Sequence, residues 1–218
     1  MDIFKSENTS TTPGNSPKLS SGILKKIIIW GVIVLLILIV YFTISGSYNG
    51  MVNREEAVTK QWANVENVYQ RRADLIPNLV ATVKGYADFE KSTLTAVIEA
   101  RAKATSVNIK ADNLDPAALQ KFQQAQDGLS SALGKLMVVV EKYPELKANQ
   151  NFLDLQAQLE GSENRITVER KKYNETTQDY NTYIRRFPKN MFANMFGFSK
   201  KGYFEASAGA EKAPEVKF

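Results

Sequence analysis

The side chains that could carry chemistry in this 218-residue sequence are carboxylates, lysines, tyrosines and hydroxyls, because histidine and cysteine are both absent. Their absence excludes a thiolate nucleophile, a histidine general base, a disulfide framework and a zinc site with Cys or His ligands. A two-metal carboxylate bundle is excluded too, since it takes Glu-x-x-His motifs from facing helices. We therefore interpret the acids as solvated helix faces; they are Asp88, Glu90, Asp154, Glu160, Glu163 and Glu169.

Nucleotide-binding and hydrolase motifs are missing as well. Lys84-Gly85-Tyr86 brings lysine and glycine together, but the sequence has no G-x-x-x-x-G-K-[ST] loop and no strand to precede one. There is no G-x-S-x-G nucleophile elbow, and the threonines at 176, 177 and 182 have no partner base, which favours a surface role. We expect a non-enzymatic protein with no catalytic residue, metal ligand, cofactor or small-molecule substrate.

The most specific charged stretch is QRRADLIPNLV, residues 70–80, where two arginines and an acid precede a proline. One interpretation is a charged site that binds a partner. The other is a corner, at which Arg71 and Arg72 meet the exposed carbonyls of a helix end and Pro77 begins the next helix. The net charge of +5 is scattered along the chain, so we expect no nucleic-acid partner.

A transmembrane segment precedes these residues. Residues 27–44 read IIIWGVIVLLILIVYFTI and carry no charge. At about 1.5 Å per residue, the run covers most of a hydrocarbon core roughly 30 Å thick. A cleavable signal peptide has a shorter apolar region, and a buried core helix would need a large surrounding core. We predict one membrane anchor, residues 23–46, with Ile27, Trp30, Leu35, Leu36, Tyr41 and Ile44 in the bilayer.

Lysines before the span slightly outnumber the basic residues after it. Lys18, Lys25 and Lys26 precede the apolar run, while Arg54 and Lys60 follow it. By the positive-inside rule this favours a cytoplasmic N-terminus and a soluble part outside the membrane. We expect a single-pass protein of a bacterial inner membrane.

The remaining sequence shows helical periodicity. Apolar residues recur at steps of three and four, beginning with Val58, Trp62, Val65 and Tyr69. Four helices are predicted, and their approximate ranges are 47–75, 78–104, 115–142 and 147–186. The fold class is all-α, with the transmembrane helix followed by a long antiparallel four-helix bundle of up-down-up-down topology. The predicted domains are a disordered polar tail (1–22), the anchor (23–46), the bundle (47–187) and an aromatic C-terminal tail (188–218).

Topology then predicts two candidate surfaces. If the chain reverses at residues 75–78 and again at Pro144, both corners lie at the membrane-distal tip, where we expect a partner to meet Arg71, Arg72, Asp74, Pro77 and Asn78. The chain after the fourth helix returns toward the bilayer, and its aromatic and basic composition is typical of an interfacial segment. An alternative is that this tail packs on the bundle. Its candidate residues are Arg185, Arg186, Met191, Phe192, Met195, Phe196, Phe198, Lys200 and Lys201.

Several stretches together resemble the LemA family of bacterial membrane proteins. They are QRRADLIPNLVATVKGYADFE (70–90), EARAKA (99–104), ENRITVERKKYNETTQDYNTYIRRFPKNMFANMFGF (163–198) and the closing YFEASAGAEKAPEVKF. The resemblance extends from the anchor to the C-terminus, and it implies a membrane-anchored helical bundle without an established enzymatic activity. A relative is associated with the formation of magnetosome membranes, which implies a role in organising membrane. The resemblance supplies no catalytic residues.

Two functional hypotheses follow from these observations. The first is a non-enzymatic scaffold or adaptor that self-associates and organises or remodels membrane or membrane complexes. Its partners would be the lipid bilayer, further copies of the chain and other membrane proteins. The second is a membrane-anchored receptor or signalling module that binds a ligand or protein at the distal tip. The first is favoured by the long helices, the single anchor and the lack of catalytic groups.

Overall fold

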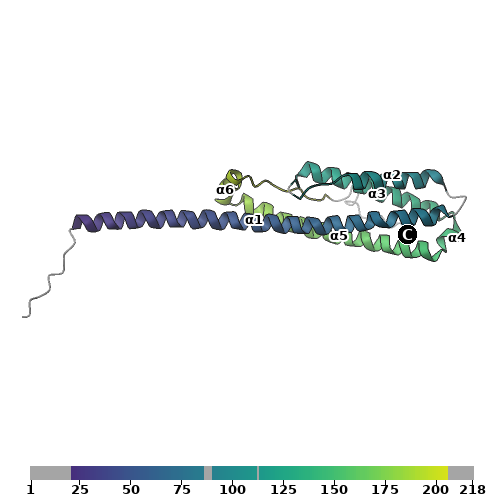
Figure 1. The fold of residues 1–218 in the computed structure, drawn as a ribbon, viewed down its shortest axis with the longest axis horizontal. Coiled ribbons are helices and arrows are strands. Elements are labelled where there is room, and N and C mark those ends of the chain that lie inside the picture. Colours follow the sequence, from purple (N-terminus) through teal and green to yellow (C-terminus); the bar gives the residue numbers. More distant parts are fainter. Residues whose placement is uncertain (1–20, 86–89, 112, 206–218) are drawn as a thin grey trace, which may run out of the picture. The chain divides into compact units, whose positions relative to one another are not determined.

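The computed structural model describes residues 21–85, 90–111 and 113–205, and within these residues the regular secondary structure is all helix, without a strand (Figure 1). The all-α class predicted from the sequence is therefore confirmed. The six helices are α1 Ser21–Lys84, α2 Lys91–Ser106, α3 Pro116–Val140, α4 Pro144–Lys147, α5 Gln150–Arg185 and α6 Lys189–Phe196. The chain divides into two compact units, Met1–Ser45 and Gly46–Phe218. Most of the predicted polar tail, together with Asp88 and residues 206–218, lies outside the described residues.

The first unit contains the predicted membrane anchor. Residues 27–43 form part of α1, and all of their side chains are exposed. The helix that contains this stretch is long and apolar enough to cross a membrane by length and composition. The hydroxyl of Thr43 donates to the carbonyl of Ile39 at 2.7 Å, which satisfies the hydroxyl inside the helix, as a hydrocarbon environment requires. A continuous exposed apolar surface of this length is suited to lipid.

In the second unit α1, α2, α3 and α5 form the helical bundle (Figure 1). The face predicted for α1 is buried, since Val58, Trp62, Val65, Tyr69 and Ile76 are each at most 5% exposed. Two clusters of buried apolar side chains fill the interior. An aromatic cluster extends along α1 from Met51 to Tyr69 and includes Phe122 and Tyr173, and an aliphatic cluster extends from Ile76 to Val83.

The predicted reversal at residues 75–78 is wrong, because α1 continues through Pro77 to Lys84. A proline inside a helix removes one hydrogen bond and typically costs about 3 kcal/mol. Here the carbonyl that Pro77 leaves without its helical donor belongs to Ala73, and Nε of Arg101 in α2 donates to it at 2.8 Å. The neighbouring helix thus supplies the missing donor, and the first corner of the bundle falls between Lys84 and Lys91.

The predictions for the other helix ends are closer. Asp115 caps α3 by accepting from the backbone N–H of Ala118 at 2.9 Å, and Pro116 occupies the first turn. The corner predicted near Pro144 is present, although Pro144 begins the short helix α4. Asn149 then caps α5 by accepting from the N–H of Phe152 at 3.1 Å.

Candidate functional site

Arg72 forms a buried polar hub that joins the helices of the bundle. Its side chain is 2% exposed, and Nη1 donates to Glu163 Oε2 on α5 at 2.7 Å. Nη1 also donates to Ser130 Oγ at 2.9 Å, and Nη2 donates to Gln126 Oε1 at 2.8 Å, both on α3. Gln126 Nε2 in turn donates to the carbonyl of Ala104 in α2 at 3.3 Å. Because a buried charge is tolerated only when paired and hydrogen-bonded, this network indicates a structural role.

The structure does not place the predicted tip residues at a helix end. Arg71, Asp74, Pro77 and Asn78 are exposed, but they lie within α1 because the helix does not stop at Pro77. Arg72 is enclosed by the bundle, so its prediction as a residue open to a partner is wrong. Adjacent helix positions point about 100° apart, which is why one arginine is exposed and the next is buried. Contact of a partner with the four exposed residues stays a prediction.

A surface groove lies beside Pro77, between α1 and α2. Its volume is about 320 Å³, and its lining residues are Ile76, Pro77, Val80, Ala81, Lys84, Ile98 and Arg101. The floor is apolar, and Ile98 is 44% exposed. Lys84 and Arg101 add positive charge to this apolar surface. A groove of this composition fits an apolar side chain next to an acidic group.

A smaller cavity, about 110 Å³, lies near the Arg72 hub and is lined by residues that include Glu66, Tyr69 and Gln126. Burial raises the pKa of the Glu66 carboxyl above its usual range. Burial also raises the pKa of Tyr69 to about 12, although the nearby Arg170 and Arg72 oppose the shift. Within the described residues no group of three acids is close enough to hold a metal ion. The prediction that no cofactor binds stays a prediction.

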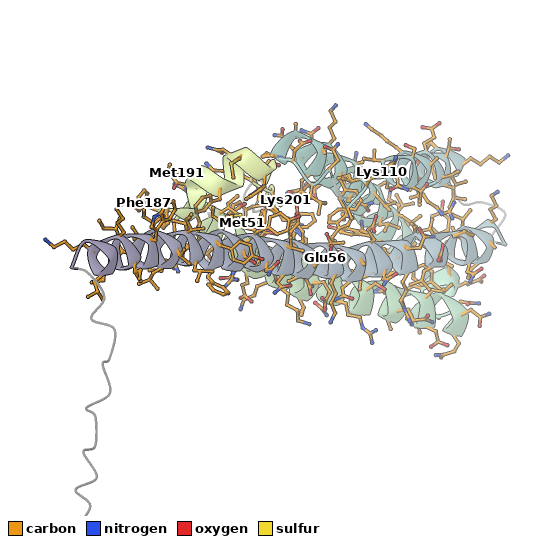
Figure 2. The ribbon with its side chains drawn as sticks, turned by 60° about the vertical axis from the view of Figure 1, so that its left-hand side comes forward. Met51, Glu56, Lys110, Phe187, Met191 and Lys201 are labelled. Carbon is orange, nitrogen blue, oxygen red and sulfur yellow. The ribbon has the colours of Figure 1, made fainter. Side chains whose placement is uncertain are left out.

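The C-terminal tail is partly integrated into the bundle. The Lys201 side chain is 6% exposed, and its Nζ forms an ion pair with Glu55 Oε1 on α1 at 2.7 Å. Figure 2 shows Lys201 beside α1, whereas Phe187 and Met191 project outward. Lys201 was predicted among the membrane-proximal residues open to lipid, but it is buried, and its ammonium pairs with the half-buried Glu55. Phe192 and Phe198 are half-buried against the aromatic cluster.

Residues 199–205, which we call the C-terminal strap, are held in extended form by side-chain amides. Asn181 accepts from the N–H of Lys201 at 3.0 Å and donates to its carbonyl at 2.9 Å. Asn174 makes the same pair of hydrogen bonds with Phe204, both at 2.9 Å. Gln123 makes them with Glu205, both at 3.0 Å. Each amide takes the place that a neighbouring strand would occupy in a sheet.

The strap delivers Phe204 into the aromatic cluster. Phe204 is 5% exposed, and its ring lies 6.2 Å from that of Trp62 and 5.4 Å from that of Tyr173. The guanidinium of Arg170 covers the Phe204 ring at 4.9 Å. The N–H of Gly202 donates to the carbonyl of Leu114 at 2.8 Å. The fit is close, since a Cβ at Gly202 would lie 2.8 Å from Cα of Pro116.

Sequence reasoning missed Phe204 and the three amides, although a signal was present. Each amide directly follows an aromatic residue of the core, in the pairs Phe122-Gln123, Tyr173-Asn174 and Tyr180-Asn181. An amide beside a core position needs a hydrogen-bond partner. The strap backbone supplies that partner in all three cases.

The outer side of α6 carries exposed apolar side chains beside the exposed Asn190 and Asn194. Met191 is 61% exposed, Met195 63% and Phe196 41%, and Phe187 just before α6 is 81% exposed. The inner side packs on the bundle through Ala193, which is 3% exposed. The predicted basic residues Arg185, Arg186 and Lys200 are exposed near this helix. The tail therefore divides into an inward part and an apolar, basic outward part.

Comparisons with known proteins identify a family and several relatives of this chain. The model of the LemA family matches residues 61–218. Magnetosome protein MamQ 2 of Paramagnetospirillum magneticum strain AMB-1 is 28% identical over 176 residues, covering 72% of this chain and 64% of the relative. Magnetosome protein MamQ of Magnetospirillum gryphiswaldense strain MSR-1 is 28% identical over 181 residues, covering 74% and 66%. The protein LemA of Metamycoplasma hominis is 25% identical over 213 residues, covering 94% and 93%. The chain thus spans less than two thirds of the length of these magnetosome relatives.

Proposed function

The chain belongs to the LemA family, and from this premise we propose that it is a non-enzymatic, membrane-anchored scaffold that self-associates and organises membrane or membrane complexes. The observation that carries the proposal is how the bundle uses its polar side chains. Hydrogen bonds between helices join Arg72 to Gln126 and Glu163. The three amides Gln123, Asn174 and Asn181 bind the backbone of the C-terminal strap. An enzyme would aim such groups at a shared, water-excluding site. In this bundle they stabilise the helices, so the protein acts through its outer surfaces.

The anchor gives the scaffold its location. One segment of α1 has the length and composition of a membrane span, and two of the relatives are magnetosome proteins. An anchor confines all copies to one surface, which raises their effective concentration and favours weak contacts between bundles. We place the protein in the bacterial inner membrane, with the N-terminus in the cytoplasm.

Self-association can be tested with single cysteines, because the chain has none of its own. Val138→Cys on α3 and Val168→Cys on α5 are suitable, since these side chains are 69% and 50% exposed. In native membranes a short bismaleimide should link copies through one face more than the other, at a yield that persists when the protein is diluted with lipid. The cysteine-free chain is the control. Cross-linking that falls in proportion to dilution at both positions would contradict the proposal.

A second candidate function is a receptor or signalling module, and the groove beside Pro77 is the observation in its favour. A photo-reactive side chain at Ile98 should then capture one distinct protein. Ala81→Trp, which fills the groove, should abolish the capture, and Ala102→Trp on the exposed side of α2 should not. Capture of only lipid, or only further copies of the chain, would argue against this candidate.

A further inference from the structure

We propose that α6 and Phe187 form an interfacial foot, a surface that rests in the headgroup region of the bilayer and binds anionic lipid. The foot consists of the apolar side chains Phe187, Met191, Met195 and Phe196 and the basic side chains Arg185, Arg186 and Lys200. The inference uses the same membrane anchor as the proposed function but is independent of self-association.

The first support is the composition of the outer face of α6. Met191 and Met195 are one helical turn apart and share a face, and both are more than 60% exposed. A helix on the surface of a water-soluble bundle shows polar residues on its outer face. In α6 the inner face is taken up by the bundle through Ala193 and Phe192, and on the outer face Met191, Met195 and Phe196 lie beside the exposed Asn190 and Asn194. This mixture of apolar and uncharged polar side chains is suited to the interface between hydrocarbon and water. Single exposed apolar residues are common on protein surfaces, but a contiguous group marks an interaction site.

The second support is the contact between the foot and Tyr48, a residue that lies shortly after the apolar run of the anchor. The ring of Tyr48 lies 5.1 Å from that of Phe196 and 5.8 Å from that of Phe198. Tyr48 follows Ile44, the last residue of the apolar run, with only Ser45, Gly46 and Ser47 between them. This link spans about 6 Å as a helix and about 14 Å at most when extended. Whatever the orientation of the bundle, Tyr48 and the Phe196 and Phe198 rings that contact it therefore stay close to the headgroup layer.

The third support is the charge around the foot. Arg185, Arg186 and Lys200 are exposed and have no acidic partner among the described residues, whereas the nearby Arg54 and Lys201 are paired with Asp179 and Glu55 at 2.9 and 2.7 Å. Exposed cations beside apolar and aromatic side chains match the composition of the membrane interface. Anionic headgroups attract such cations over about one Debye length.

The foot is also held in position before any lipid binds. At its N-terminal side, Lys189 Nζ lies 3.8 Å from the centre of the Tyr183 ring. At its C-terminal side, Gly197 ends the helix with φ of 80°, and the hydroxyl of Tyr180 donates to the carbonyl of Ser199 at 2.9 Å. Because both sides are attached to the bundle, α6 presents its outer face without the entropic cost of ordering a free segment.

The test uses full-length protein in liposomes, with an environment-sensitive fluorophore on a single cysteine. Met195→Cys reports on the foot. Val168→Cys is the matched control, because Val168 is 50% exposed and lies about 25 Å before Arg185 along α5 by the helical rise. With brominated lipids, we expect the label at 195 to be quenched at least threefold more strongly than the label at 168. Equal quenching at the two positions would overturn the proposal.

Two further measurements test the role of the basic side chains and distinguish contact with lipid from contact with a second copy. Adding phosphatidylglycerol should shift the emission of the label at 195 to the blue, and Arg185→Gln with Arg186→Gln should remove most of this response; an unchanged response would refute the charged part. Liposomes that hold at most one copy make the result independent of self-association. If the label at 195 is not quenched but Met195→Cys links two copies in membranes, the face is a contact between copies and the proposal is wrong.

Discussion

The buried position of Arg72 predicts that two neighbouring arginines contribute very differently to stability. Arg72→Gln should lower the free energy of unfolding strongly, and Arg71→Gln should leave it nearly unchanged. Both substitutions remove one positive charge from adjacent positions of α1. They differ in burial, since the Arg72 side chain is 2% exposed, whereas Arg71 is exposed and has no hydrogen bond or ion pair to a described residue. Arg71→Gln is thus the matched control.

The magnitude follows from the partners that Arg72 would lose. Its guanidinium donates to Glu163, Ser130 and Gln126, and hydrogen bonds to charged groups contribute about 1.5 to 3 kcal/mol each. The Glu163 side chain is 52% exposed, so water replaces the lost partner and that contribution is discounted. The amide of Gln126 is buried and cannot be rehydrated in this way. We expect a loss of about 3 kcal/mol, and less than about 0.5 kcal/mol for Arg71→Gln.

Thermal unfolding of the detergent-solubilised full-length protein can measure the difference. Trp62 is fully buried, and replacing Trp30 by Phe makes it the only tryptophan. A loss of about 3 kcal/mol should lower Tm by roughly 6 to 12 °C for a unit of this size. Glu163→Gln should lower Tm less, because a carboxamide oxygen still accepts from the guanidinium. Equal melting of the Arg71 and Arg72 variants would refute the structural role of the hub.

Three further predictions concern the rest of the unit. Arg101→Met should lower the free energy of unfolding by about 1 to 3 kcal/mol, because the carbonyl of Ala73 loses its donor. In a Pro77→Ala background the backbone N–H of residue 77 can donate to that carbonyl, so the loss should be smaller. Denaturant midpoints measure both losses. Gly202→Ala should lower the free energy of unfolding by about 1 to 3 kcal/mol, because the added Cβ clashes with the backbone of Pro116. Trp62 fluorescence should then report unfolding at a lower temperature. The pKa of Tyr69 rises from its ordinary 10.0 to about 12 on folding, so its contribution to stability is present below pH 10 and lost as pH rises toward 12. Tm should be level at neutral pH and fall above pH 10, less steeply in Tyr69→Phe, with tyrosinate absorbance as the readout.

The course of α1 shows why the sequence predicted the helices but misplaced a corner. Proline rules end a helix because a hydrogen bond is lost, and they take no account of a donor from elsewhere in the chain. The donor here is Arg101, which is distant in sequence. A contrary signal was present, since Tyr69, Ile76, Val80 and Val83 keep steps of seven, four and three through the proline. An apolar stripe that stays in phase across a proline favours one continuous helix.

The C-terminal tail shows a different limit. Periodicity identifies helices because each helix repeats a local pattern, but the strap has no pattern of its own. Its backbone hydrogen bonds go to side chains of α3 and α5, and their positions follow from tertiary packing alone. The sequence could predict that the tail was aromatic and basic. It could not decide between the bundle and the bilayer, because different residues of the tail face different environments.

The burial of Phe204 shows that the bundle core extends into the C-terminal strap. The aromatic cluster that holds Phe204 also contains Met51, near the start of the unit, and Tyr180, near the end of α5. The strap is therefore part of the core, since without Phe204 the rings of Trp62 and Tyr173 would lose a neighbour in the interior. The LemA family match covers residues 61–218, so it includes Trp62 and the strap together while leaving out the anchor. The residues matched to the family therefore include both sides of the contact between Phe204 and the rings of Trp62 and Tyr173.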